Sequence, residues 1–117
     1  MIKNLVILPT YNESKNIIII IDMLLNLDID LDILVIDDNS PDNTAQIVKK
    51  YDSDKVFIQE RAEKKGLGTA YVHGFNWALS NSYDKIIQMD ADLSHDPKEV
   101  PPMFDLLDNY DLVVGSR

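Results

Sequence analysis

The stretch KIIQMDADLSHDP, residues 85–97, guides the interpretation of the whole chain. A short apolar run followed by turn-forming residues is typical of a buried strand. Asp90 and Asp92 come directly after this run, at the end of the strand where open α/β sheets bind ligands. In an extended chain, side chains at i and i+2 point to the same side, so the two carboxylates can converge. Two such charges need a cation between them, and oxygen ligands suit Mg²⁺ or Mn²⁺, most naturally when the ion also holds a diphosphate.

The same carboxylates also have a simpler interpretation as loop or helix-capping groups. Asp96 precedes Pro97, which is the pattern of a helix cap. Ser94 follows Asp92 by two residues and would share its side if the extended geometry persisted. His95 has no neighbouring histidine and is interpreted as a turn residue. A D-x-D motif alone does not decide between a metal site and a loop.

The composition is that of an ordinary globular protein. The chain has 117 residues, 45% of them apolar and 26% charged, which predicts one domain spanning residues 1–117. The net charge of −9 argues against a nucleic-acid partner. An acidic protein that binds phosphates needs a local cation, in agreement with a metal site. The absence of cysteine excludes disulfides, thiolate metal ligands and a cysteine nucleophile.

Neither a signal peptide nor a membrane span is expected from the sequence. The first four residues lead directly into a short apolar run. The longest apolar run, residues 17–21, is interrupted by Asp22 and is too short to cross a bilayer.

Strands and helices are predicted to alternate along the chain. We expect strands at residues 5–8, 33–36, 56–58, 86–89 and 112–114, and helices at residues 13–27, 43–51, 69–81 and 97–107. This order predicts the α/β fold class, with right-handed crossovers and a mostly parallel sheet flanked by helices.

Details of several elements can also be predicted. Pro9 should end the first strand, and Asn12 or Ser14 should cap the first helix. That helix is apolar almost all round, which predicts burial on more than one side. The helix at 69–81 has an apolar stripe made of Tyr71, Val72, Phe75, Ala78 and Leu79.

Polar loops follow the first, second and fourth strands, and in a parallel sheet these loops meet at one edge. Asp37 and Asp38 end the second strand, where nucleotide-binding folds often hold a ribose or a base. Alternatively, they form a turn that caps against Ser40 and Asn43. The loop RAEKKGLG, residues 61–68, contains three cations and two glycines but matches neither G-x-G-x-x-G nor the Walker pattern. It could offset diphosphate charge, or it could be a solvated charged loop.

The chain stops just after its last predicted strand. A parallel strand normally needs cover on both faces. We therefore expect these residues to be part of a larger, truncated domain; the alternative is a naturally minimal domain.

Five blocks of sequence, taken together, resemble a known family. They are PTYNE at 9–13, VIDDNSPDNTA at 35–45, GLGTAYVHGF at 66–75, MDADLSHDP at 89–97 and VVGSR at 113–117. In this order they resemble the family 2 inverting glycosyltransferases of the GT-A (Rossmann-like) fold, and more narrowly the dolichyl-phosphate or polyprenyl-phosphate mannose synthases. The family motif commonly has glycine where this chain has Asn43, and asparagine tolerates turn geometry nearly as well.

The resemblance implies transfer of mannose from GDP-mannose to a polyprenyl phosphate, with inversion and with Mg²⁺ or Mn²⁺ as cofactor. It implies a cytoplasmic, peripheral location at the cytoplasmic face of a membrane. Membrane association would come from the polyprenyl substrate, or from an anchoring segment or partner that is not in this chain. By position, the nucleotide-sugar site would contain Pro9, Thr10, Tyr11, Glu13, Asp37, Asp38, Lys65, Gly68, Asp90, Ala91 and Asp92. The metal would be held by Asp90, Asp92 and Ser94, and the catalytic residues would be Asp92 and Arg117.

Three other functions stay open at this point. A related transferase could use UDP-glucose or UDP-GlcNAc, and a fragment of this length could bind a nucleotide sugar without turnover. A phosphohydrolase that forms an aspartyl phosphate also uses D-x-D, but usually after its first strand, whereas Asp90 follows the fourth.

Overall fold

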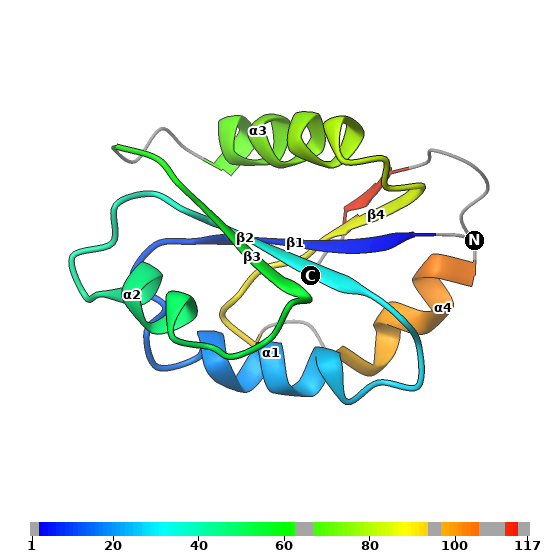
Figure 1. The fold of residues 1–117 in the computed structure, drawn as a ribbon, viewed down its shortest axis with the longest axis horizontal. Helices are drawn as coiled ribbons and strands as arrows, with labels where there is room; N and C mark the ends of the chain where they lie inside the picture. Colours follow the sequence, from blue (N-terminus) through cyan, green and yellow to red (C-terminus); the bar gives the residue numbers. More distant parts are fainter. Residues whose placement is uncertain (1–2, 63–66, 94–96, 106–111, 115–117) are drawn as a thin grey trace.

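The computed structural model describes residues 3–62, 67–93, 97–105 and 112–114, which form a parallel sheet with helices on both faces (Figure 1). The five strands are β1 (Asn4–Thr10), β2 (Asp32–Asp37), β3 (Val56–Glu60), β4 (Lys85–Gln88) and β5 (Leu112–Val114). Their order is β3-β2-β1-β4-β5, and every neighbouring pair is parallel. The predicted α/β class and parallel sheet are therefore confirmed.

The helices divide the core into two layers. They are α1 (Ile17–Leu25), α2 (Thr44–Lys49), α3 (Leu67–Ser80) and α4 (Val100–Asp105), with a 3₁₀ turn η1 (Pro97–Glu99) before α4. In Figure 1, α3 lies on one face of the sheet, and α1, α2 and α4 lie on the other. Alternate residues of β1 and β2 point into the two layers, because successive side chains of a strand face opposite ways.

The first strand runs through Pro9 rather than ending before it. Pro9 pairs in register with Ile36 of β2. The carbonyl of Ile7 accepts a hydrogen bond from the Met89 amide (3.1 Å), so the backbone of Ile7 faces β4, and Pro9 faces the same way two residues later. Proline has no N–H to donate on that side, and the pairing with β4 stops there at Gln88, whereas the pairing of β1 with β2 continues to Thr10.

The first helix differs from the prediction in its start and in its burial. It begins at Ile17, and its N-cap residue Asn16 makes no side-chain capping bond, so the predicted caps are wrong. Its buried residues are Ile17, Ile20, Ile21 and Leu24. Ile19 and Met23 are 47% and 40% exposed, because α1 packs on one face of the sheet, so the expected burial on several sides is wrong.

Small residues bring α3 close to the sheet. Ala70 and Ala78 are buried against it, whereas Val72 and Leu79 of the predicted stripe are exposed. A Cβ atom on Gly74 would lie 2.9 Å from Cγ2 and 3.0 Å from Cδ1 of Ile7, which is fully buried in β1. The small residues, rather than the large apolar ones, therefore form the centre of the contact between α3 and the sheet.

Gly74→Ala should destabilise the protein although alanine is the better helix former. Alanine gains about 1 kcal/mol in helix propensity, but overpacking a buried contact typically costs about 1–3 kcal/mol. Urea unfolding of the variant and its parent measures the difference. Gly68→Ala is the matched control, because nothing lies within 4 Å of a Cβ built there; it should be neutral or stabilising. A Gly74→Ala variant more stable than its parent would contradict the packing.

Candidate functional site

The strand order creates a topological switch point between β1 and β4. From β1 the chain builds outward through β2 to β3, and β4 and β5 lie on the other side of β1. Ligands of open α/β sheets bind beyond the carboxyl ends of the strands at such a point. The loops that begin after Thr10, Asp37 and Gln88 all lie at this edge. They contain most of the site residues predicted from the sequence.

Acidic side chains from these three loops lie close enough to influence one another. Partial burial raises the pKa of Glu13, and the charges of Asp92, Asp42 and Asp90 raise it further, against a hydrogen bond from Asn16. Glu13 follows β1, Asp42 follows β2, and Asp90 and Asp92 follow β4. The structure thus places Asp90 and Asp92 near enough to Glu13 for their charges to act on it, and the binding roles predicted for the three residues stay predictions.

Asp42, which the sequence analysis did not single out, connects two of the loops. It accepts hydrogen bonds from the hydroxyl (2.5 Å) and amide (3.1 Å) of Thr44 and from the Ser14 amide (3.0 Å). Although partial burial acts in the opposite direction, these bonds lower the pKa of Asp42. The Thr44 hydroxyl also accepts a bond from the Glu13 amide (3.1 Å), so the start of α2 holds Glu13 in place. Asn43 has a φ of 67°, which is in the left-handed region. Glycine adopts this geometry freely and asparagine tolerates it, so Asn43 can stand where the family motif commonly has glycine.

The D-x-D segment is bent rather than extended. The chain bends over residues 91–93, and Leu93 has a φ of 65°. The extended geometry predicted to align Asp90 with Asp92 therefore does not hold. Asp90 is half-buried, Ala91 is buried and Asp92 is exposed. A left-handed leucine is strained, and such strain is concentrated at functional sites.

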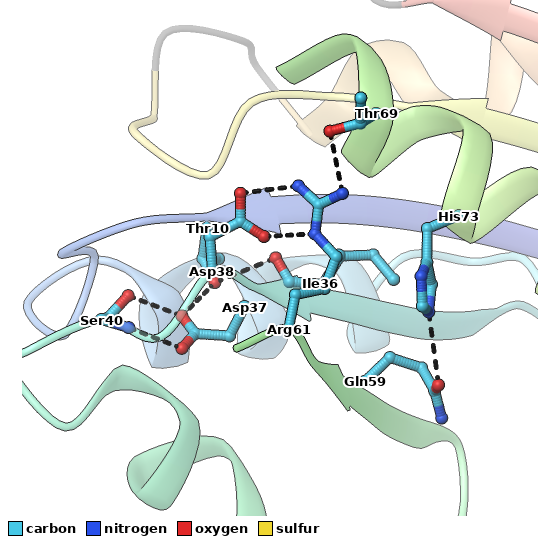
Figure 2. A network of polar contacts seen from close by, with 9 residues as sticks. All are labelled: Thr10, Ile36, Asp37, Asp38, Ser40, Gln59, Arg61, Thr69 and His73. Carbon is cyan, nitrogen blue, oxygen red and sulfur yellow. Dashed lines mark hydrogen bonds and ion pairs between the residues drawn. The ribbon is translucent and has the colours of Figure 1, made fainter. Parts of the chain in front are cut away.

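The two carboxylates after β2 are both engaged within the chain (Figure 2). Asp37 is 1% exposed and accepts bonds from the Thr10 hydroxyl (2.7 Å) and from the hydroxyl (2.6 Å) and amide (3.0 Å) of Ser40. Of the two interpretations of this segment, Asp37 therefore follows the second: it forms a turn, and Ser40 is its partner. Thr10, which was predicted to line the nucleotide site, is buried beneath this turn.

Arg61 forms a bidentate ion pair with Asp38 (Figure 2). The distances are 2.5 Å from Nε to Oδ1 and 2.7 Å from Nη2 to Oδ2, and Nη1 donates to the hydroxyl of Thr69 at 2.9 Å. Arg61 is only 9% exposed and Asp38 only 6%. Arg61 is therefore not part of a solvated charged loop. The sequence does contain a signal for this contact: Arg61 comes directly after β3, the strand that pairs with β2, so it lies beside the residues that follow β2.

The remaining residues of the predicted site are either exposed at its edge or lie outside the described part of the chain. Tyr11 is exposed just beyond β1, and Gly68 is exposed in the first turn of α3. Lys65, Ser94, Asp96 and Arg117 lie outside the described residues, so their predicted roles stay predictions. Within the described parts of the chain, no three or more His, Cys, Asp or Glu side chains group closely enough to hold a metal ion by themselves.

Asp92→Asn should lower the pKa of Glu13, because it removes one of the charges that raise it. A carboxyl-detected NMR titration of Glu13 in the variant and its parent measures this. Asp28→Asn is a suitable control, because Asp28 is exposed beyond the far end of α1. An unchanged pKa of Glu13 in Asp92→Asn would contradict the closeness of the two loops.

A parallel sheet of this order, with helices on both faces and a switch point between β1 and β4, defines the doubly wound class of α/β proteins. The family model for glycosyl transferase family 2 matches residues 5–117, and the chain belongs to this family. The α/β domain of GT-A type expected from the sequence is confirmed.

Two relatives match nearly the whole chain. A polyprenol monophosphomannose synthase of Mycolicibacterium smegmatis is 41% identical over 98% of this chain and 45% of its own length. An undecaprenyl-phosphate mannosyltransferase of Micrococcus luteus is 39% identical over 97% of this chain and 47% of its own length. The chain therefore spans slightly less than half the length of these relatives.

Two solved structures share the fold. The mannosyltransferase PcManGT from Pyrobaculum calidifontis, in complex with GDP-Man and Mn²⁺, superposes with a TM-score of 0.63 at 28% identity, covering 77% of this chain and 27% of that one. S. aureus TarS superposes with a TM-score of 0.73 at 25% identity, covering 87% of this chain and 31% of that one. In the described parts of this chain, no helix is long and apolar enough to cross a membrane.

Proposed function

We propose that this protein transfers mannose from GDP-mannose to a polyprenyl phosphate, with inversion at the anomeric carbon and with a divalent metal ion. The observation that carries the proposal is the match of nearly the whole chain, at about 40% identity, to enzymes named for mannose transfer to polyprenyl carriers. The grouping of Glu13, Asp90 and Asp92 at the switch point supports it, because this is where such a sheet binds a nucleotide.

The donor is placed along the carboxyl edge of the sheet. Asp38, beyond β2, is assigned to the nucleoside end, since a carboxylate accepts hydrogen bonds from base or ribose donors. Asp90 and Asp92, beyond β4, are assigned to the diphosphate end. Tyr11 and Glu13 follow β1, the strand that lies between β2 and β4. Asp37 contributes indirectly, by holding the turn that Asp38 begins.

The carboxylates fit a metal ion that is shared with the substrate. Mg²⁺ typically takes one or two carboxylates and completes its shell with phosphates and water. Asp90 and Asp92 supply such a pair, and their combined charge, which also raises the pKa of Glu13, is what a cation would offset. When bound, the ion would stabilise the negative charge that develops on the departing GDP. Ser94 is a proposed further ligand from outside the described residues.

The acceptor supplies its own nucleophile. A phosphate oxygen is already anionic, so it can form its bond to the anomeric carbon while the bond to the GDP oxygen breaks, without a strong base. Inversion requires approach from the face opposite GDP, and we assign Arg117 to hold the acceptor phosphate there. Because polyprenyl phosphates reside in membranes, we propose a peripheral location at the cytoplasmic face.

Calorimetry with GDP-mannose tests the donor assignment, with Mn²⁺ and after its removal by a chelator. We expect binding that depends on the metal and that GDP displaces more effectively than UDP. Transfer of labelled mannose to a short polyprenyl phosphate tests the reaction. Absence of GDP binding under both conditions would refute the proposal, preference for UDP would favour a UDP-sugar transferase, and donor binding without transfer would leave a nucleotide-sugar-binding protein.

A further inference from the structure

We propose that Arg61 is a positioning residue for recognition of the donor nucleoside, acting through Asp38 without touching the donor. This inference rests on the proposed function, in which Asp38 lies at the nucleoside end of the site. The structure shows that this carboxylate pairs with Arg61, which directly follows another strand, β3. Both side chains are shielded from solvent. The sequence distance between the two residues gives no hint of the contact.

The orientation of the Asp38 carboxylate is determined by the guanidinium group. Each oxygen accepts one bond from Arg61, at 2.5 and 2.7 Å, in a side-by-side arrangement (Figure 2). Such a planar fork restrains both the direction and the rotation of a carboxylate, which a single point charge cannot do. An ionised carboxylate has about four acceptor positions, and the two bonds from Arg61 occupy two of them.

Arg61 is itself restrained through its backbone and through its side chain. Its backbone amide donates to the Asp37 carbonyl at 2.8 Å, which continues the pairing of β2 with β3. Its third side-chain bond goes to Thr69 in the first turn of α3, next to Gly68. Arg61 thus connects the loop after β2, the end of β3 and the start of α3 around the proposed nucleoside end.

The nucleoside end is held by contacts that do not include Asp90 or Asp92. The Asp38 amide donates to the Thr10 carbonyl (3.2 Å), and the Ser40 hydroxyl accepts from the Asn12 amide (2.9 Å). These contacts hold the loops after β1 and β2 together without involving the D-x-D segment. A change at Arg61 should therefore affect nucleoside recognition and leave diphosphate binding intact.

Arg61→Lys tests the proposal, because lysine keeps the charge and loses the fork. Calorimetry in Mn²⁺ should compare two probes, GDP and inorganic pyrophosphate. We expect the affinity for GDP to fall about tenfold or more, as loss of charge-assisted hydrogen bonds would give, while pyrophosphate affinity stays within about twofold. Thr69→Val keeps the ion pair, removes the acceptor of the bond from Nη1 of Arg61 and lies at an exposed position. It should show the same selective loss to a smaller extent.

The comparison of the two probes distinguishes positioning from a general effect on folding. If both affinities fell by the same factor, or if neither variant changed GDP binding, the role of Arg61 would be refuted. If Arg61→Lys failed to fold, an unchanged GDP affinity in Thr69→Val would refute it on its own. A parent protein that bound pyrophosphate but not GDP would instead refute the proposed function itself.

Discussion

Asp92→Ala is expected to reduce kcat/KM for mannose transfer on the order of 10²–10³-fold, the usual effect of removing a group that stabilises charge developing in the transition state. Asp92 is exposed and lies among like charges, as the raised pKa of Glu13 indicates. Its removal should therefore change the free energy of unfolding by no more than about 0.5 kcal/mol. Initial rates of labelled mannose transfer and urea unfolding, measured on the same preparation, separate the two effects.

Asp28→Ala is the matched control for this experiment. Asp28 is also an exposed aspartate, but it lies beyond the carboxyl end of α1, away from the site edge of the sheet. Its replacement should change neither rate nor stability. If Asp92→Ala kept full metal-dependent affinity for GDP-mannose, Asp92 would not be a metal or diphosphate ligand, and the D-x-D segment would have to be interpreted as a loop.

Arg61→Met is expected to reduce the free energy of unfolding by about 3–5 kcal/mol, because it leaves the carboxylate of Asp38 buried without its partner. Both side chains of the pair are less than a tenth exposed (7% and 8%). A loss of this size is a large part of the stability of a domain this small. Urea unfolding without any ligand measures it, so the result does not depend on the proposed function.

Two further variants show whether burial is the cause. Lys55→Met breaks an ion pair with Asp30 in which the side chains are 45% and 76% exposed, and it should cost no more than about 1 kcal/mol. Arg61→Met combined with Asp38→Leu removes both buried charges and should regain most of the loss. Equal losses in Arg61→Met and Lys55→Met would contradict the burial of the pair.

The sequence predicted the fold well where local patterns are sufficient. Short apolar runs bounded by turn residues located all five strands, and their alternation with helices predicted the parallel sheet. The ends of elements were less predictable. The first helix begins at Ile17, later than predicted, and the amides of Glu13 and Ser14 before it donate to Thr44 and Asp42, which are far away in the sequence.

The candidate site was predicted to a similar degree. The carboxylates after β1, β2 and β4 could be assigned to one edge, because all carboxyl ends of a parallel sheet lie together. The turn of Asp37 with Ser40 was one of two interpretations left open, and the partners that are distant in the sequence could not be assigned. The side chain of Asp37 belongs to a buried turn, and Asp38 pairs with Arg61 because β3 lies next to β2.

The sequence by itself determined the order of the elements, the polar edge of the sheet and the family resemblance, since each follows from short local patterns and their order along the chain. The tertiary structure decided which side chains are enclosed. It gave Arg61 a buried partner, left Ile19 and Met23 exposed, and brought Gly74 against Ile7. These contacts depend on strand order and on the distance between helix and sheet, which arise only when segments distant in the sequence pack together.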